Sequence, residues 1–418
     1  MRHYTPTILR NTITLILAGG QGERLFPLTK DRSKPSVPFA GSYRIIDFSL
    51  SNCINSALRR IFVLTQYKSQ SLNRHLRDGW NLLSRELNEF IENVPPQKRI
   101  HSHWYEGTSD AIFQNIFLIE QFKPERILVL SGDHIYRMDY RDLIAYHLQK
   151  NADVTIASYE YPSEKARDFG VMKVNQDGRV IDFIEKPDNP PEIPGKPGCS
   201  LVNMGIYIFN TPCLVRSVIQ ENKNPSSNND LGKNVFPRLV KDENAAVYAF
   251  PFNNQGSHNP YWRDVGSLSS YYNSSMDLLD KGQAFDLFSR DWPFRSASVQ
   301  LPPSQLNLNH NNSVNINQSL ISLGCRIEGA LNKCVISPGV NIGEGSQLNG
   351  CIVFNGVDIG RNCRIKNTII DKGVRIPDGC EIGYNPEVDS QQFMVTNNHL
   401  TIIPKGMVVE KDIVVDDK

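Results

Sequence analysis

The sequence has almost no net charge, because 45 lysines and arginines are balanced by 44 aspartates and glutamates, leaving +1 at neutral pH. Such a chain has no overall field with which to hold nucleic acid or an anionic membrane. It also lacks a long hydrophobic run at its start: the apolar stretch 13–17 is too short for a membrane span and has no signal-peptide layout. We therefore expect no nucleic-acid partner and no membrane association, and an anionic substrate would have to be bound by local charges.

Paired cysteine motifs are absent as well. The eight cysteines are scattered and include no C-x-x-C pair, the usual sign of a zinc site or a redox dithiol. We therefore expect reduced thiols that serve as core or turn residues of a cytoplasmic protein.

Residues 13 to about 279 alternate short apolar runs with helix-like stretches. This alternation is typical of an α/β domain with a mostly parallel sheet. The length of 418 residues predicts more than one domain. Strands are predicted at 14–18, 61–65, 127–130, 154–158 and 206–209, and helices at 45–57, 111–121 and 140–150, the last with Asp139 as its N-cap.

A different pattern begins after Asp291. Residues 301–317 are rich in Pro, Asn and Ser, and beyond them aliphatic residues recur in steps of six or five. Three steps sum to 17, as in the series 342–359–376, 348–365–382 and 336–353–370. This repeat predicts a left-handed parallel β-helix with glycines such as Gly343, Gly360 and Gly383 at its corners. The expected organisation is an α/β domain over 1–290, a linker over 291–317 and a β-helix over 318–418 that serves assembly and regulation.

The first predicted strand leads into a glycine-rich turn that contains Gly19, Gly20 and Gly22. A turn of this kind can expose backbone N–H groups to phosphate. It is not a dinucleotide fingerprint, because Leu25 stands where the third glycine is needed, and the chain contains no G-x-x-x-x-G-K-[ST] loop. Arg24, Lys30, Arg32 and Lys34 follow within a dozen residues. Taken alone, the segment fits a triphosphate site or a solvated basic loop.

Several further blocks occur along the chain in a fixed order. The run 17–25 is followed by Leu28-Thr29, Lys34-Pro35 and Arg44-Ile45-Ile46-Asp47-Phe48. The later blocks are 51–56, 104–111 (Trp-Tyr-Glu-Gly-Thr-Ser-Asp-Ala), 132–136 (Gly-Asp-His-Ile-Tyr), 183–187 (Phe-Ile-Glu-Lys-Pro), 204–207 and 261–266 (Tyr-Trp-Arg-Asp-Val-Gly). Together they closely resemble the glucose-1-phosphate adenylyltransferases, strongly over residues 13–302 and more loosely over the β-helix.

The resemblance implies a Rossmann-like nucleotidyltransferase domain followed by the β-helix. It implies that ATP and glucose 1-phosphate are converted to ADP-glucose and pyrophosphate with Mg²⁺, the activating step of glycogen synthesis. It also implies a homotetramer controlled by sugar phosphates or similar metabolites. Arg44 and Lys405 are the expected anion contacts of such an effector.

The resemblance also implies individual roles. Asp133 and Asp264 resemble the two carboxylates that hold the metal, although either one alone could be an ordinary turn residue. Arg24 and Lys34 are assigned to the β- and γ-phosphates, with Arg24, Lys34 and Asp133 as the catalytic set. The nucleotide site is expected to consist of Gly19, Gly20, Gly22, Gln66, Tyr105, Gly107 and Asp110. The glucose 1-phosphate site is expected to consist of Glu185, Lys186, Asn203, Tyr207, Asp230 and Trp262, with Lys186 on the phosphate.

The chain departs from the family pattern at three positions. Glu23 stands where a small hydroxyl residue or lysine is usual, Asn203 stands where serine or glycine precedes Met-Gly, and Leu231 replaces a common aromatic residue. These departures affect the details of the expected sugar site rather than the reaction type.

Three other functions fit parts of the sequence. Residue spacing does not distinguish adenine from uracil or thymine, so formation of UDP-glucose or dTDP-glucose is one alternative. A second activity as an acyltransferase would need a histidine base, but the segment between His310 and His399 contains none. A non-catalytic regulatory subunit should have lost a phosphate or metal residue, whereas Arg24, Asp133 and Lys186 are all present.

Overall fold

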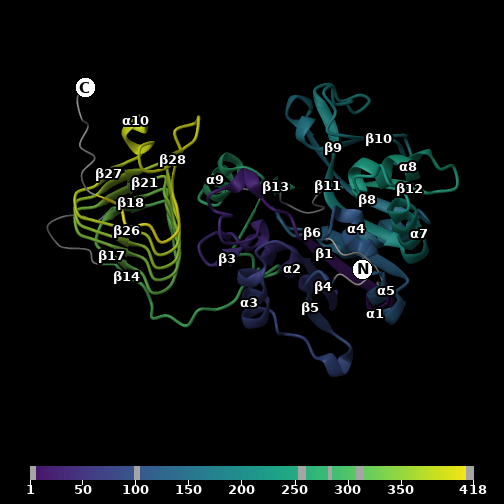
Figure 1. Ribbon diagram of the computed structural model, residues 1–418, viewed down its shortest axis with the longest axis horizontal. Helices are drawn as coiled ribbons and strands as arrows, with labels where there is room; N and C mark the ends of the chain where they lie inside the picture. The colour runs from purple at the N-terminus through teal and green to yellow at the C-terminus, as the bar shows by residue number, and fades with distance from the viewer. Residues whose placement is uncertain (1–5, 98–103, 253–259, 281–284, 307–314, 411–418) are drawn as a thin grey trace. The chain divides into compact units, whose positions relative to one another are not determined.

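Both backbone patterns expected from the sequence are present in a computed structural model of the chain (Figure 1). The structure describes residues 6–97, 104–252, 260–280, 285–306 and 315–410. The chain divides into two compact units. The first unit comprises 1–20, 48–69 and 76–262, and the second comprises 21–47, 70–75 and 263–418. Each unit is described by itself.

A mixed sheet forms the centre of the first unit, in the order β10-β9-β11-β6-β1-β4-β5, with β8 and β12 joined through β11. Its middle is parallel, since β1 pairs with β6 and β4, and β4 pairs with β5. The antiparallel strand β11 continues the sheet beyond β6. The strands are β1 (Thr12–Ala18), β4 (Arg60–Thr65), β5 (Phe90–Val94), β6 (Arg126–Ser131), β8 (Val154–Pro162), β9 (Gly170–Val174), β10 (Val180–Glu185), β11 (Cys199–Asn210) and β12 (Val247–Pro251).

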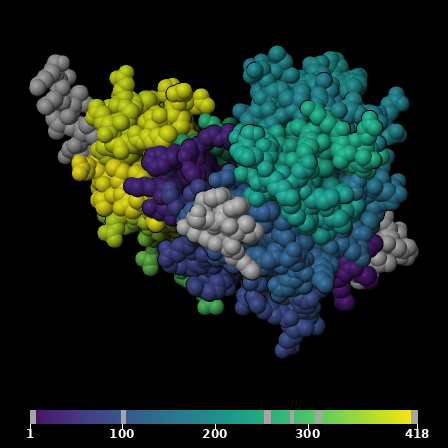
Figure 2. Space-filling view, turned by 45° about the vertical axis from the view of Figure 1, so that its right-hand side comes forward, coloured from purple at the N-terminus to yellow at the C-terminus, as the bar shows by residue number. Residues whose placement is uncertain are grey.

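Helices cover this sheet. Alternate apolar side chains of β1 and β6 share a core with α4, α5, α7 and α8. The helices are α1 (Pro6–Arg10), α2 (Ile45–Asn55), α3 (Gln70–Gly79), α4 (Thr108–Phe113), α5 (Ile116–Phe122), α6 (Tyr140–Gln149), α7 (Thr211–Asn222) and α8 (Phe236–Lys241), and the π-helix η5 (Leu231–Val235) precedes α8. Asp139 caps α6 as predicted, because its side chain accepts a hydrogen bond from the Arg141 N–H. In Figure 2 the segments from β9 to α8, in shades of teal, form one continuous surface.

The predicted helix 111–121 is instead two helices. The break falls at Gln114 and Asn115, between α4 and α5. The Asn115 side-chain amide donates to the Ala111 carbonyl at 2.8 Å and to the Tyr105 hydroxyl at 2.8 Å. A side chain that bonds to the backbone of the preceding turn competes with the regular helix, which accounts for the interruption.

Strands of two or three residues form the β-helix of the second unit, and they pair in parallel except Met394–Val395, which is antiparallel to Thr401–Ile403. They stack into three sheets, with β14 at one end of the coil and β27 near α10 at the other (Figure 1). The predicted pairs are confirmed, since Ile342 pairs with Ile359, and Ile359 with Ile376. The other two series are in register as well. The strands are β14 (Gln305–Leu306), β15 (Ile316–Asn317), β16 (Leu320–Ile321), β17 (Arg326–Ile327), β18 (Ala330–Asn332), β19 (Val335–Ile336), β20 (Asn341–Ile342), β21 (Gln347–Asn349), β22 (Ile352–Val353), β23 (Asp358–Ile359), β24 (Arg364–Lys366), β25 (Thr368–Ile370), β26 (Arg375–Ile376), β27 (Glu381–Ile382), β28 (Met394–Val395) and β29 (Thr401–Ile403).

The inward aliphatic side chains are almost completely buried, and five of the eight cysteines lie among them. All eight cysteines are free thiols, as expected. At a corner, Gly383 has a φ of +86°, and a Cβ there would lie 1.9 Å from the Lys366 carbonyl oxygen. Only glycine fits this position.

The β-helix begins earlier than predicted. Strand β14 lies inside the segment 291–317 that was predicted to be a linker, and it already pairs with β17. The polar composition of this segment concealed a short strand; residues 307–314 of the predicted linker lie outside the described residues. The remaining elements of the second unit include α9 (Leu268–Asp277), α10 (Pro386–Asp389), β2 (Pro38–Phe39), β3 (Tyr43–Arg44), η1 (Glu23–Leu25) and η2 (Lys34–Ser36). Within the part of the chain that is described, no helix is both long and apolar enough to cross a bilayer.

Candidate active site

The glycine turn follows the carboxyl end of β1, next to the end of β4. A Cβ added to Gly19 would lie 3.2 Å from the Cβ of Gln66, whereas Gly20 is exposed and has open space. Gln66 is 5% exposed, and its amide donates to the Tyr105 carbonyl at 3.1 Å. The structure therefore brings together three predicted nucleotide residues, Gly19, Gln66 and Tyr105, at the edge where parallel strands end. Such an edge is the usual position of a ligand in an α/β sheet.

The block 104–111 is fixed by buried hydrogen bonds. The Asp110 carboxylate accepts from the Glu106 N–H at 3.0 Å and from the Gln114 amide at 2.8 Å. The Tyr105 ring is largely buried, and burial raises the pKa of its phenol. Gln114 was not singled out in the sequence, although it lies one helical turn after Asp110. Asp110 thus supports the shape of the loop from inside.

Gly107 allows a second loop to approach this block. A Cβ on Gly107 would lie 2.1 Å from the Asn229 carbonyl oxygen, which accepts a hydrogen bond from the Ser109 N–H at 2.8 Å. The Thr108 hydroxyl lies 3.2 Å from the Asp230 carboxylate. The predicted nucleotide loop and the predicted sugar-binding Asp230 are therefore in contact within the first unit. Asp230 also caps η5, because one of its oxygens accepts from the N–H groups of Gly232 and Lys233.

Glu185 lies at the end of β10, beside Asp230. Cβ atoms on Gly170 and Gly232 would lie 2.7 and 2.8 Å from a Glu185 carboxylate oxygen, so both glycines provide its space. Burial and the negative charge of Asp230 raise the pKa of Glu185, while Lys186 and Lys233 lower it. Lys233 was not predicted as a site residue, because it belongs to none of the sequence motifs. In the structure, η5 brings it near Glu185.

Lys186 follows directly and is exposed. Its φ is +50°, and its N–H donates to the Phe169 carbonyl at 3.0 Å. A lysine with positive φ is uncommon, and such backbone strain occurs preferentially at functional sites. The hydrogen bond holds the backbone of Lys186 in this conformation while its ammonium group remains accessible.

Asn203 and Tyr207 are hydrogen-bonded partners on β11. The Asn203 amide donates to the Tyr207 hydroxyl at 2.8 Å. Burial raises the pKa of the Tyr207 phenol, and the negative charges of Asp230, Glu185 and Asp133 raise it further. These carboxylates therefore lie near enough to the Tyr207 ring to influence it. Predicted sugar residues and one predicted metal carboxylate are gathered around this tyrosine.

Trp262 is a buried side chain and not an exposed aromatic ring on which a sugar could stack. Its side chain is 1% exposed, and its ring centroid lies 5.4 Å from that of Phe169, 5.9 Å from Tyr159 and 5.2 Å from His134. These contacts make it part of an aromatic cluster. Direct contact between Trp262 and a sugar stays a prediction.

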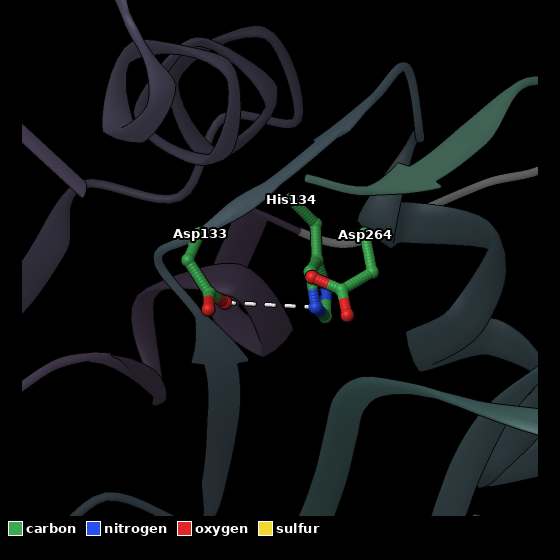
Figure 3. Close-up of side chains that lie close together, drawn as sticks. All are labelled: Asp133, His134 and Asp264. Carbon is green, nitrogen blue, oxygen red and sulfur yellow. Dashed lines mark ion pairs between the residues drawn. The ribbon is translucent and has the colours of Figure 1, made fainter. Parts of the chain in front are cut away.

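Asp133 follows β6 after a single glycine. The Ser131 hydroxyl donates to the Asp133 carboxylate. The His134 Nε2 lies 3.5 Å from the same carboxylate oxygen (Figure 3). Asp264, the other predicted metal ligand, is also labelled in Figure 3. It belongs to the second unit, whereas Asp133 and His134 belong to the first. Each aspartate offers carboxylate oxygens, the type of ligand that magnesium prefers.

The predicted phosphate-binding residues of the second unit lie close together. The Lys34 Nζ lies 2.9 Å from the Asp264 carboxylate. A Cβ on Gly266 would lie 2.9 Å from both an Arg24 guanidinium nitrogen and an Asp264 oxygen. Gly22 has a φ of +67°, and a Cβ there would lie 3.0 Å from the Cβ of Lys34. The glycine turn therefore passes directly beside the lysine that it was predicted to accompany.

Arg44 and Lys405 also belong to the second unit. The Arg44 guanidinium donates to the Ser36 hydroxyl at 2.6 Å and to the Ser71 carbonyl at 2.8 Å. Lys405 is exposed and lies 3.7 Å from Asp31. Burial lowers the pKa of Lys372 to about 8, and the positive charges of Arg44, Arg32 and Lys405 add to this. The structure thus places both predicted effector contacts near one partly buried lysine, which sequence reasoning missed.

Comparison with known proteins shows the family of the chain. The nucleotidyl transferase family matches residues 13–281, and a GlmU-like C-terminal hexapeptide family matches residues 302–403. The glucose-1-phosphate adenylyltransferase of Rhodopirellula baltica is 44% identical over 410 residues, covering 96% of this chain and 92% of the relative. The chain belongs to the glucose-1-phosphate adenylyltransferase family.

Other members of the family cover the chain equally well. A Vibrio vulnificus glucose-1-phosphate adenylyltransferase 2 is 45% identical over 404 residues, covering 95% of this chain and 99% of its own length. The glucose-1-phosphate adenylyltransferase of Nitrosospira multiformis is 42% identical over 415 residues, or 98% and 97% of the two chains. Near-complete coverage on both sides means that family membership includes both the nucleotidyltransferase domain and the left-handed β-helix.

Proposed function

We infer that the chain transfers the adenylyl group of ATP to glucose 1-phosphate, giving ADP-glucose and pyrophosphate. Identity of 42–45% over nearly the full length to relatives of that name carries this conclusion. The reaction activates glucose for glycogen synthesis. Formation of UDP-glucose or dTDP-glucose is not favoured, since all these relatives are named as adenylyltransferases.

The chemistry requires charge neutralisation and positioning rather than a general base. The phosphate of glucose 1-phosphate is already ionised at neutral pH, and its oxygen attacks the α-phosphorus of ATP as pyrophosphate leaves. We assign Lys186 to the sugar phosphate, and Arg24 and Lys34 to the β- and γ-phosphates. Charge that develops on the departing pyrophosphate is stabilised most effectively by cations that are already in place. The 2.9 Å pair between Lys34 and Asp264 supports such preorganisation.

Nucleotidyltransferases of this kind use a divalent metal ion, and we propose that it is Mg²⁺ held by Asp133 and Asp264. Magnesium prefers hard oxygen ligands and is commonly bound by one or two carboxylates together with substrate phosphates. Two aspartates fit this preference, whereas the free cysteines lie elsewhere in the fold. When bound, the ion would neutralise phosphate charge and orient the reacting groups. The Ser131 hydroxyl and His134 orient the Asp133 carboxylate.

For the sugar we propose a polar site formed by Glu185, Asp230, Tyr207 and Asn203. The carboxylates would accept hydrogen bonds from sugar hydroxyls. We assign the base and ribose of ATP to the glycine turn together with Gln66, Tyr105, Gly107 and Asp110. The contact of Thr108 with Asp230 supports this division, because it joins the two loops that would hold the two substrates.

We also propose control by a metabolite anion at Arg44 and Lys405, assembly as a homotetramer and a cytoplasmic location. Burial lowers the pKa of Lys372, and the positive charges of Arg44, Arg32 and Lys405 lower it further; an anion bound there would offset these charges. Eight free thiols fit a reducing compartment. A screen of sugar phosphates and pyruvate against turnover tests the regulation, and light scattering of the purified protein tests the assembly.

Pyrophosphate release is the decisive measurement for the function. The purified chain, glucose 1-phosphate and Mg²⁺ should release pyrophosphate with ATP and much more slowly with UTP, dTTP or GTP. Asp133→Asn should lower kcat on the order of 100- to 1000-fold, because it removes charge stabilisation of the transition state. Preference for UTP or dTTP, or an inactive wild-type protein, would contradict the proposal.

A further inference from the structure

Asn203 occupies an irregular point of β11. The pairing of β11 with β8 loses its register between Asn203 and Tyr207, and Gly205 inside this interval has a φ of +70°. The irregularity brings the side chains of two residues four positions apart within hydrogen-bonding distance. In a regular strand, residues four apart on the same face would be about 13 Å from each other.

The orientation of the Asn203 amide is fixed by the backbone. Its Oδ1 accepts a hydrogen bond from the Gly205 N–H at 2.9 Å. A backbone N–H can only donate, so the atom facing it is the amide oxygen, and the other end of the side chain is the NH₂ group. This NH₂ group lies 2.8 Å from the Tyr207 hydroxyl and must donate to it.

The phenol oxygen of Tyr207 is therefore an acceptor in this contact, and its own hydrogen points elsewhere. No acceptor for this hydrogen is found among the residues that the structure describes. The Tyr207 side chain is 8% exposed, and burial together with nearby carboxylates raises its phenol pKa, so the group stays protonated throughout the physiological range. Tyr207 is thus a neutral hydrogen-bond donor held among anions.

A sugar hydroxyl is suited to this environment because it both donates and accepts. Ionised Glu185 and Asp230 can only accept hydrogen bonds. A hydroxyl that donates to a carboxylate still has lone pairs free, and a phenol O–H is a suitable donor to them. We propose that Asn203 is a positioning residue for the hexose: it holds Tyr207 so that the phenol donates to a hydroxyl oxygen of glucose 1-phosphate. This inference rests on the proposed function and deepens it.

Asn203→Asp provides the sharpest test because it changes one group. The aspartate can still accept from the Gly205 N–H, but it cannot donate to Tyr207. It instead attracts the phenol hydrogen that the substrate needs. We expect the KM for glucose 1-phosphate to rise about tenfold, in line with the loss of one hydrogen bond in a buried site. The KM for ATP should change less than about twofold.

A double-mutant cycle separates this effect from added charge. In a Tyr207→Phe background, Asn203→Asp should cause no further rise in the KM for glucose 1-phosphate. Simple charge repulsion would act with or without the hydroxyl. Asn175→Asp is the matched control, since the Asn175 Oδ1 also accepts from backbone N–H groups, those of Asp177 and Arg179, but lies in the turn between β9 and β10. It should leave both KM values unchanged.

The outcomes distinguish the inference from the function on which it rests. A wild-type protein that makes no ADP-glucose would refute the proposed function. An active wild type with a normal KM in Asn203→Asp, or an effect that persists in Tyr207→Phe, would overturn the role of Asn203 while the function stands. If Asn203→Asp does not fold, Asn203→Ser removes the amide donor without adding charge, and the same cycle with Tyr207→Phe decides the question.

Discussion

The Lys34 ammonium lies 2.9 Å from a carboxylate oxygen of Asp264, although 230 positions separate the two residues in the sequence. The side chains are 9% and 20% exposed, so water screens the pair only weakly. The pair links the proposed phosphate-binding lysine to a proposed metal ligand. Each charge holds the other in position before a substrate arrives, so neutralising either one removes a close ionic contact of the other.

Asp264→Asn should therefore affect both metal use and turnover. We expect kcat to fall on the order of 100-fold or more and the Mg²⁺ concentration for half-maximal activity to rise, because a neutral amide is a poorer ligand and weakens the ion pair that positions Lys34. Initial rates across a magnesium titration measure both effects. Asp277→Asn, which alters the partner of Arg263 on α9, is the matched control. An unchanged magnesium dependence in Asp264→Asn would exclude Asp264 as a ligand.

Lys186→Ala should weaken one substrate selectively. Removing the ammonium should raise the KM for glucose 1-phosphate about tenfold or more and change the KM for ATP little, since the charge is assigned to the sugar phosphate. Lys173→Ala is the control, because Lys173 is a lysine of the neighbouring strand β9, paired with Asp182 at 3.6 Å. Equal effects on both substrates would argue that Lys186 acts on the fold rather than on the phosphate.

The register of the β-helix could be predicted because its period is local. One coil of 17 residues aligns each aliphatic residue with the next, and the pairs Leu348–Ile365 and Ile365–Ile382 follow directly. The first coils differ in length, since Gln305 pairs with Arg326, 21 positions further on, whereas Ile327 pairs with Ile342, 15 positions further on, and the linker prediction ended too late for this reason. Because the coil length changes at the start of the β-helix, the aliphatic residues there do not recur at a constant spacing that the sequence would reveal.

The site could be predicted by resemblance but not by spacing. The resemblance indicated Asp230 and Glu185 separately, whereas their proximity depends on η5, Gly170 and Gly232, which the sequence did not indicate. The break between α4 and α5 depends on one Asn115 side chain that bonds to the backbone of the preceding turn. Contacts of this kind depend on tertiary structure, so propensity and periodicity do not reveal them.

Gly107→Ala should disturb the contact between the two substrate loops. The added Cβ would lie 2.1 Å from the Asn229 carbonyl oxygen, so the backbone must move and the hydrogen bond from the Ser109 N–H would weaken. We expect a destabilisation of about 1–3 kcal/mol and a higher KM for ATP. Thermal unfolding and initial rates measure these changes. Gly20→Ala, where a Cβ meets nothing within 4 Å, should leave the thermal midpoint unchanged. A Gly107→Ala protein with the wild-type midpoint would show that the loops do not pack as described.

Glu185 should determine part of the acid limb of the pH profile. Burial and the negative charge of Asp230 raise the pKa of Glu185 above the ordinary value of 4.5. As the pH falls, this carboxylate therefore becomes protonated earlier than an ordinary glutamate and can then accept fewer hydrogen bonds. In Glu185→Gln this contribution to kcat/KM for glucose 1-phosphate should disappear. The substrate phosphate also titrates, near pH 6, but it does so equally with both proteins, so their ratio reports Glu185.

The same carboxyl has a consequence for stability without substrate. A raised folded-state pKa means that folding disfavours the charged form; this penalty is fully present above the folded pKa and disappears as the pH falls below the unfolded value. Glu185→Gln should therefore raise the thermal midpoint at pH 7 but not at strongly acidic pH. A gain that is independent of pH would point to packing instead of charge.

Ile359→Ala should test whether the β-helix core is packed as tightly as its burial suggests. Ile359 is 2% exposed and pairs with both Ile342 and Ile376, so truncation leaves a cavity between coils that cannot easily close. We expect a loss of about 2–5 kcal/mol, and only about 1 kcal/mol for Ile359→Val, which keeps the branched shape. Urea unfolding monitored by amide exchange in the β-helix measures both. Equal losses in the two variants would indicate that neighbouring coils collapse into the space, and that the rigid stack inferred from the 17-residue period is in fact deformable.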